Sequence, residues 1–489
     1  MSALAYSLFP ILNILGASIA VFALTMLAPL AVAFFDNEPA LAAYDNAFLI
    51  AFVSGAALWL ATRQFKRELL PRDGFLLVVL IWTVLPAFAT LPLLLHLPQL
   101  SFTDAYFETV AGMTTTGATT LSGLEALPPS INFWRCLLQW MGGMGILVLM
   151  VAILPLLGVG GTQLFRAETA GPLKEAKLTP RITDTAIGLW SVYGAISAAC
   201  FLAYWGGGMG ALDAAMHMFS TMSLGGFSPY DGSFAHFESP LLEWTAVVFM
   251  LAASMNFALY FLCLRRRTIG VLLTDTEARG TLLVMAASVL LVALYLHLHR
   301  VYDNPLDTMR HAAFNVVSIA STTGYMTADF DKWPTFAPWF MLALSGVATS
   351  AGSTGAGIKM IRFIVLAKQA RREMLRALHP RVIMPVRIRD SVVENNVIFA
   401  VLAFMAMYGT TIIALTFLMT IAGLDVITAF SAVVACVNNT GPGLNQVGPA
   451  TNYGVLNDFE TWVCTVAMLL GRLELMSVFV LFTPAFWRK

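Results

Sequence analysis

Ten stretches of this chain are long and apolar enough to cross a lipid bilayer, and they constrain its fold more than any other feature. A spanning helix needs about 20 consecutive, mainly apolar residues. Charged residues make up only 11% of the 489 residues, whereas about 25% is typical of soluble proteins. We therefore predict an all-α, polytopic membrane protein with ten transmembrane helices. The ten runs are 7–35, 44–62, 74–97, 131–158, 185–206, 240–264, 280–299, 335–366, 393–422 and 459–484.

The distribution of basic residues predicts the orientation. Lys and Arg collect in cytoplasmic connectors. With ten spans, the connectors 63–72, 163–183, 265–279 and 359–389 fall on the same side as the C-terminal tail. Those segments hold all but five of the 28 basic residues, and the five are Arg135, Arg300, Arg310, Lys332 and Arg472. Both termini are therefore predicted to be cytoplasmic.

Several other classes of protein are disfavoured. The first apolar run has no positively charged start and is too long for a signal peptide, so we interpret it as a spanning helix. A net charge of zero and a pI of about 7 give no support for nucleic-acid binding. The five cysteines form no C-x-x-C pair, which argues against a disulfide framework or a zinc site. They are Cys136, Cys200, Cys263, Cys436 and Cys464.

Four outer connectors each open with a short, moderately apolar segment. These segments are 101–113, 211–223, 305–321 and 424–437. Each carries an aspartate in its first turn, where a carboxylate complements the free N–H groups of a helix start. The aspartates are Asp104, Asp213, Asp307 and Asp425. Because such segments are too short to cross a bilayer, we predict short helices that enter from outside and stop.

A glycine follows each short segment at an equivalent place. The four loops read TTTGAT (114–119), SLGGFS (223–228), STTGYM (321–326) and NNTGPG (438–443). Aligning them on their glycines gives four units of span, short helix, loop and span. We expect two leading helices in 1–72 and pore units in 73–162, 163–278, 279–389 and 390–489.

Four such loops around one axis favour a cation filter. Non-helical backbone at membrane depth is tolerated only where it is buried in protein or lines a watery cavity. Glycine accepts positive φ and lets neighbouring carbonyls face a common axis, where they replace the hydration shell of an ion. The partly negative C-terminal ends of the short helices favour a cation. Close helix packing would explain one such loop, but it does not explain four at equivalent places.

The four loops and the final MLLGRLELMSVFVLFTPAFW (468–487) resemble the TrkH branch of the Trk/Ktr/HKT superfamily of potassium transporters. The resemblance covers essentially the whole chain, including the two leading spans that the shorter KtrB type lacks. It implies four pseudo-symmetric helix–pore-loop–helix repeats around one pore, in a homodimer of the bacterial inner membrane. In plant relatives a serine at the first filter glycine accompanies sodium transport, so Gly117 favours potassium.

The resemblance also implies that backbone carbonyls of the filter bind potassium. On this sequence they belong to Thr115, Thr116, Gly117, Leu224, Gly225, Gly226, Thr322, Thr323, Gly324, Asn439, Thr440 and Gly441.

The eighth apolar run contains an interruption, SGVATSAGSTGAGIKMIR (345–362). A glycine costs about 1 kcal/mol in a helix interior, so four of them predict a broken helix, which in transporters often marks the pathway. A kinked packing helix is the alternative. A nucleotide-binding loop is excluded, because no strand precedes it and no Lys-Ser/Thr pair follows. The resemblance implies a gating loop beneath the filter, with Lys359 at its cytoplasmic exit. Its residues are Gly346, Gly352, Ser353, Thr354, Gly355, Gly357 and Lys359.

Arg472 is the single basic residue well inside an apolar run. Such a charge costs about 2.5–3.5 kcal/mol on insertion scales, which makes it a functional candidate. Glu474 lies on a different helix face and is a poor partner. The resemblance implies a pore barrier that contacts the gating loop, and the alternative is an arginine bound to buried carbonyls for structure alone.

The basic connector 359–389 is either a solvated cytoplasmic loop or a docking site for a regulator. The resemblance implies a TrkA-type nucleotide-binding ring as that partner, so nucleotides would act there and this chain would carry no organic cofactor.

We therefore predict potassium uptake through a gated, channel-like pore. The alternative is a symporter that couples potassium to sodium or protons, and the small number of carboxylates in the spans disfavours it. An intramembrane enzyme would need a nucleophile with a base or a metal-ligand cluster, and the seven histidines are scattered.

Overall fold

The computed structural model describes residues 3–65, 69–152, 182–388 and 391–488. Within these ranges almost all regular structure is helical. The predicted connector 163–183 lies outside the described residues except for its last two positions.

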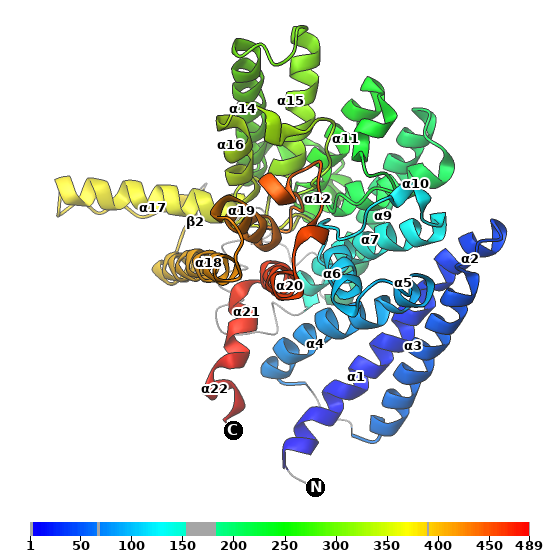
Figure 1. Ribbon diagram of the computed structural model, residues 1–489. Coiled ribbons are helices and arrows are strands. Elements are labelled where there is room, and N and C mark those ends of the chain that lie inside the picture. The colour runs from blue at the N-terminus through cyan, green and yellow to red at the C-terminus, as the bar shows by residue number, and fades with distance from the viewer. Residues whose placement is uncertain (1–2, 66–68, 153–181, 389–390, 489) are drawn as a thin grey trace.

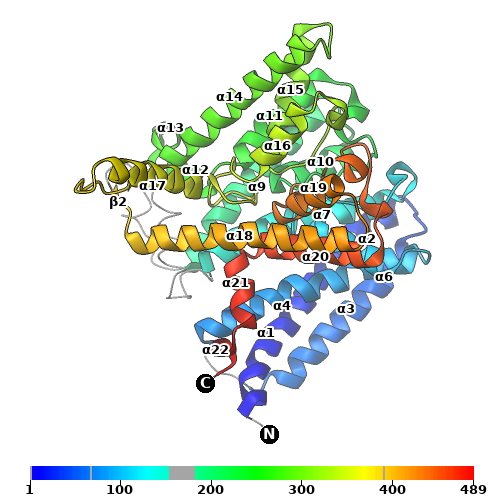
Figure 2. The same ribbon diagram turned by 60° about the vertical axis from the view of Figure 1, so that its left-hand side comes forward.

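The chain opens with a helical hairpin. Helices α1 (Ala3–Thr25) and α2 (Leu27–Phe35) are followed by α3 (Leu41–Thr62), which runs back alongside α1 in both views (Figures 1 and 2). The two helices pack closely because glycines face each other, and a Cβ atom on Gly55 would lie 2.5 Å from the backbone nitrogen of Ala20. These are the two leading helices that the sequence predicts.

A similar order of elements then occurs four times: a long apolar helix or a pair of consecutive helices, a helix of 12 to 16 residues, and a further helix after the glycine loop. The first set is α4 (Pro71–Ala89), α5 (Leu91–His96), α6 (Phe102–Met113) and α7 (Pro129–Ala152). The second is α9 (Ile182–Gly206), α10 (Ala211–Ser223), α11 (Pro240–Ala253), α12 (Phe257–Arg266) and α13 (Gly270–Thr274). The third is α14 (Thr276–Leu298), α15 (Pro305–Ala320), α16 (Phe336–Ser345) and α17 (Met360–Leu378). The fourth is α18 (Asn395–Ile421), α19 (Val426–Val437), α20 (Asp458–Arg472), α21 (Leu475–Phe479) and α22 (Pro484–Trp487).

The four short helices α6, α10, α15 and α19 agree with the predicted segments to within two residues at each end. They form the centre of the molecule, since every residue of α6 from Ala105 to Met113 is buried. Side-chain capping explains where α6, α15 and α19 begin, whereas α10 starts after Gly210 without a side-chain cap. Ser101 accepts a hydrogen bond from the backbone N–H of Asp104, and Asp425 accepts one from that of Thr428.

Two predicted spans bend sharply between consecutive helices. The run 240–264 bends by 87° between α11 and α12, and the run 459–484 bends by 109° between α20 and α21. At the first bend, Asn256 starts a new helix by accepting from the N–H of Ala258. At the second, Glu474 takes a left-handed φ of 58°, which ends helical geometry.

The interruption predicted in the eighth run is confirmed, because α16 ends at Ser345 and α17 begins at Met360. Helix α17 then projects away from the body of the molecule (Figures 1 and 2). Beyond it, β1 (Arg387–Ile388) and β2 (Ser391–Val392) pair antiparallel in register Arg387 with Val392. The sequence analysis did not anticipate this small hairpin.

Six of the described helices are long and apolar enough to cross a bilayer, and eight qualify if each bent pair counts as one span. The chain is therefore an α-helical, multi-pass membrane protein. The full set of ten spans stays a prediction.

Candidate ion pathway

Each of the four glycine loops leaves its short helix with the same backbone conformation. The aligned glycines all have positive φ, at 78°, 78°, 86° and 93° for Gly117, Gly226, Gly324 and Gly441. The residue two positions earlier is also left-handed, although it carries a side chain. These residues are Thr115, Leu224, Thr322 and Asn439, with φ between 50° and 65°. Backbone strain of this kind persists only where the surroundings fix it.

The loops also repeat one hydrogen-bonding pattern. In the first, Thr115 donates its N–H to the carbonyl of Gly112 and Thr116 donates to that of Ala111. The equivalent bonds are Leu224 to Thr221, Gly225 to Ser220, Thr322 to Ile319, Thr323 to Ser318, Asn439 to Cys436 and Thr440 to Ala435. Because the N–H groups turn back onto the helix, each loop satisfies its donors while it leaves helical geometry.

Close contacts join the four loops into a closed ring. A Cβ atom on Gly117 would lie 2.0 Å from the carbonyl oxygen of Gly225 in the next loop. A Cβ atom on Gly226 would likewise lie 2.0 Å from the carbonyl oxygen of Thr323, and one on Gly324 would lie 2.1 Å from that of Thr440. A Cβ atom on Gly441 would lie 2.7 Å from the carbonyl oxygen of Thr116, which closes the ring. Only glycine therefore fits at these four positions, and each loop places a carbonyl against the next.

Two of the expected ligand carbonyls already accept hydrogen bonds. The carbonyl of Gly225 accepts from the side-chain amide of Gln139 at 2.6 Å, and that of Gly441 accepts from the Tyr453 hydroxyl at 2.7 Å. Gln139 also accepts from the N–H of Phe227, so it holds the second loop on both sides of Gly226. Sequence reasoning missed Gln139, because a lone amide in an apolar run carries no signal.

The broken segment 346–359, called here the 346–359 loop, lies directly against the ring. Thr354 donates to the carbonyl of Met222 at the end of α10. The N–H of Ala356 donates to the hydroxyl of Thr322 in the third glycine loop, at 3.2 Å. The loop that contains the glycines singled out in the sequence therefore contacts the third glycine loop. Its role as a gate stays a prediction.

A buried carboxylate on α14 holds this loop in place. Glu277 is 6% exposed and accepts from the N–H groups of Ala351 at 2.7 Å and Ile361 at 3.2 Å. Gly352 has φ of 77°, and a Cβ there would lie 2.7 Å from the side-chain oxygen of Asn256. The loop is therefore packed and hydrogen-bonded at both ends.

Lys359 lies at the end of the loop, where α17 begins, and its side chain is buried. It is 5% exposed, and its ammonium donates to the carbonyl of Gly355 within the same loop. A buried ammonium is stable only with such partners, so the side chain folds back onto the loop.

Arg472 is 3% exposed and bridges the loop to the first set of helices. One guanidinium nitrogen donates to the carbonyl of Thr354 at 2.9 Å and the other terminal nitrogen to that of Gly142 at 3.0 Å. The implied contact between Arg472 and the 346–359 loop is therefore present. Glu474 is not its partner, as expected from the sequence.

Glu474 instead binds Arg362 on α17 at 2.9 Å. Arg362 is 2% exposed and lies over the ring of Phe404, 4.1 Å from its centroid. This pair joins residues 112 positions apart, a separation that no local sequence pattern reveals. A cavity of about 30 Å³, which is room for about two waters, lies between Arg362, Arg472, Lys359 and the loop.

Among residues 3–65, 69–152, 182–388 and 391–488, no three His, Cys, Asp or Glu side chains gather into a metal-binding group.

Comparisons with known proteins agree with this geometry. The family model TrkH, described as cation transport protein, matches residues 42–489. The Trk system potassium uptake protein TrkH of Salmonella typhimurium is 43% identical over 98% of this chain and 99% of its own length. The Trk system potassium uptake protein TrkG of Escherichia coli is 37% identical over 96% of each chain. The crystal structure of the potassium transporter TrkH from Vibrio parahaemolyticus superposes with a TM-score of 0.90, at 40% identity, over 98% of this chain and 99% of that one.

Proposed function

This chain belongs to the TrkH family of cation transport proteins, and on that premise we propose that it takes up potassium across a bacterial inner membrane through a gated, channel-like pore. Its relatives are named as potassium uptake proteins, which are transporters rather than enzymes. Potassium is therefore the substrate that we assign to the site.

The ring of glycine loops carries the proposal. Four backbone carbonyls, one from each loop, approach the glycine of the next loop at equivalent positions. Such a closed arrangement supports a filter that exchanges an ion's water shell for carbonyl oxygens. The short helices end at the ring, so their partly negative termini favour a cation there.

We assign the gate to the 346–359 loop and Arg472. The loop contacts the ring through Ala356 and Thr322, and Arg472 contacts the loop through Thr354. A buried guanidinium repels a cation strongly in a low-dielectric site. Conduction in this account requires the loop and the arginine to move away from the axis.

Membership of the TrkH family is also the basis on which we infer the partners. We propose a homodimer with one pore per protomer and a cytosolic TrkA-type nucleotide-binding ring that docks on the basic segment 359–389. We propose that both termini are cytoplasmic. That they share one side of the membrane is supported by α22 and the start of α1, which lie at the same end of the molecule in both views (Figures 1 and 2).

The test is ion flux into liposomes that contain the purified protein. We expect potassium to move in preference to sodium and to follow an imposed membrane potential without a sodium or proton gradient. Flux that requires such a gradient would identify a symporter instead. If the wild-type protein is silent, Arg472→Ala should conduct, and silence of that variant as well would contradict the pore.

A further inference from the structure

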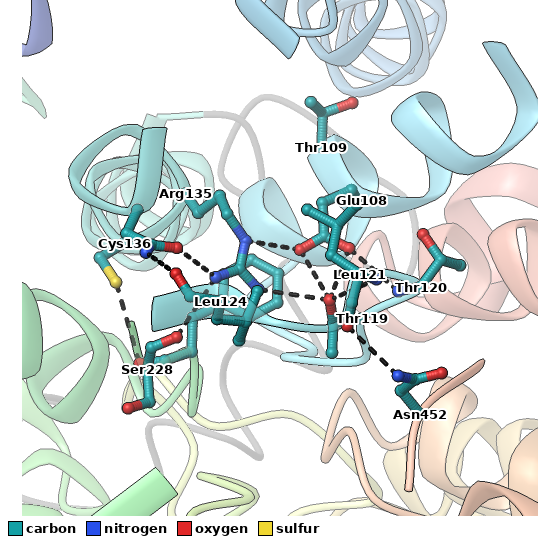
Figure 3. A network of polar contacts seen from close by, with 12 residues as sticks. Glu108, Thr109, Thr119, Thr120, Leu121, Leu124, Arg135, Cys136, Ser228 and Asn452 are labelled. Carbon is teal, nitrogen blue, oxygen red and sulfur yellow. Dashed lines mark hydrogen bonds and ion pairs between the residues drawn. The ribbon is translucent and has the colours of Figure 1, made fainter. Parts of the chain in front are cut away.

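A buried ion pair lies on the outer side of the ring, apart from the gate. Glu108 belongs to the short helix α6 and Arg135 to α7, and both side chains are 1% exposed. The Nε of Arg135 lies 2.7 Å from a carboxylate oxygen of Glu108 (Figure 3). Removing two charges from water costs several kcal/mol each, so a pair this deeply buried calls for a specific explanation.

The pair holds the segment by which the first glycine loop leaves the ring. The carboxylate of Glu108 accepts from the hydroxyl of Thr119 at 2.9 and 3.0 Å and from the N–H of Thr120 at 3.1 Å. These residues follow Gly117 by two and three positions. Figure 3 shows that Thr119 lies between the two charged groups, and its hydroxyl also accepts from Arg135 at 3.3 Å.

The same arginine reaches the second loop. It donates to the carbonyl of Ser228 at 3.2 Å, two residues after Gly226, and its guanidinium lies 4.3 Å from the ring centroid of Phe227. Asn132 accepts from the same terminal nitrogen at 3.0 Å. The pair therefore joins the exits of two neighbouring loops.

In the other three loops, an uncharged side chain stands at or next to the position that corresponds to Glu108. The residue nine positions before the glycine is Glu108 in the first loop, His217 in the second and Asn315 in the third. His217 contacts the hydroxyl of Ser228 at 3.2 Å, and Asn315 accepts from the N–H of Thr327 at 3.2 Å. In the fourth loop Ser431, ten positions before Gly441, accepts from the N–H of Leu444 at 2.9 Å.

We propose that Glu108 and Arg135 are positioning residues for ion selectivity, which fix the exits of the first and second loops relative to each other. This inference rests on the proposed filter. Of the four side chains that brace the loop exits, Glu108 alone is a carboxylate, and its partner Arg135 reaches a second loop. Asp231 links the same two connectors farther from the ring, where it accepts from the N–H groups of Gly123 and Leu124. A carbonyl cage discriminates potassium from sodium by the positions of its oxygens and by how far they can relax. Loosening the pair should therefore change selectivity more than it changes folding.

The test compares the potassium-to-sodium permeability ratio of variants in liposomes with their thermal stability in detergent. Thr119→Val removes the bridging hydroxyl without leaving a charge unpaired, and Glu108→Gln removes the charge while keeping an acceptor. We expect both variants to lower the potassium-to-sodium permeability ratio. For Glu108→Gln we expect a roughly tenfold decrease, because that is the factor that corresponds to the free energy of one charge-assisted hydrogen bond. Total cation flux should be kept.

A matched control is the outer ion pair of Glu243 and Arg310, at 3.0 Å, which bonds no residue of a glycine loop. Glu243→Gln should lower stability but leave the permeability ratio at the wild-type value. If the wild-type protein is selective and both Thr119→Val and Glu108→Gln keep its permeability ratio, the inference is overturned. A wild type that conducts but does not discriminate would instead overturn the proposed filter. If Glu108→Gln does not fold, Thr119→Val alone decides.

Discussion

Arg472 is the residue whose burial is hardest to explain by packing alone. Its two terminal nitrogens bind backbone carbonyls of Thr354 and Gly142, while its Nε has no partner among the described residues. Hydrophobic residues of similar volume would fill the space at lower cost. The arginine therefore fits a role that uses its charge.

We expect Arg472→Ala to raise potassium flux by roughly tenfold or more, because at 4 Å two unit charges repel by about 4 kcal/mol in a partly screened site. Flux into liposomes measures this directly. Arg472→Lys keeps the charge and should stay close to the wild-type rate. Equal flux in all three proteins would contradict the barrier.

The ion pair of Arg362 and Glu474 makes a separate prediction at the same scale. Glu474→Gln leaves a guanidinium that is 2% exposed without its carboxylate partner, so the free energy of unfolding should fall by about 2 kcal/mol. Thermal unfolding in detergent measures the loss. The exposed pair of Arg376 and Glu373, at 3.5 Å, provides the control, and Glu373→Gln should change stability by less than about 0.5 kcal/mol. Equal effects of the two substitutions would show that burial does not matter here.

Among the elements, the 346–359 loop is the one whose conformation depends most on single residues. Gly352 combines positive φ with a close approach to Asn256, and Glu277 holds both flanks of the loop. A side chain at Gly352 would have to displace either the loop or the start of α12. The loop therefore has little freedom while it remains in this position.

We expect Gly352→Ala to destabilise the packed position of the loop and to change potassium flux severalfold, because alanine tolerates positive φ poorly. The control is Gly409→Ala in α18, where a Cβ would meet nothing within 4 Å. That change should add up to about 1 kcal/mol of stability through helix propensity and leave flux unaltered. Normal folding with unaltered flux in Gly352→Ala would rule out the gate.

The elements also show what the sequence could predict. Short helices were located to within two residues because their caps, lengths and following glycines are local signals. The bends at Asn256 and Glu474 were missed, since the few polar residues at each bend lie inside a run that is apolar on both sides. The pairs of Arg362 with Glu474 and Arg135 with Glu108 were missed for another reason: each joins separate helices, and only the folded chain brings them together.

On the scale of the whole molecule, one chain builds a closed ring from four loops that differ in sequence. The loops share their backbone angles and hydrogen bonds, although TTTG, SLGG, STTG and NNTG share only the final glycine. The conformation is therefore set by the glycine and by the short helix before it, while the remaining side chains differ in their contacts. Within the ring, Asn439 donates to the hydroxyl of Thr116 in the neighbouring loop at 2.8 Å. The brace at each loop exit differs accordingly, from a carboxylate to an imidazole, an amide and a hydroxyl.

The central claim is that the four glycine loops together bind potassium, and the most direct test is to locate the ion. Rubidium replaces potassium and scatters anomalously, so a crystal of the wild-type protein grown in rubidium would reveal the site. We predict an anomalous peak on the axis of the ring, within coordination distance of carbonyls at or next to Gly117, Gly226, Gly324 and Gly441. A well-ordered ring without a peak, or a peak bound by side chains elsewhere, would contradict the account.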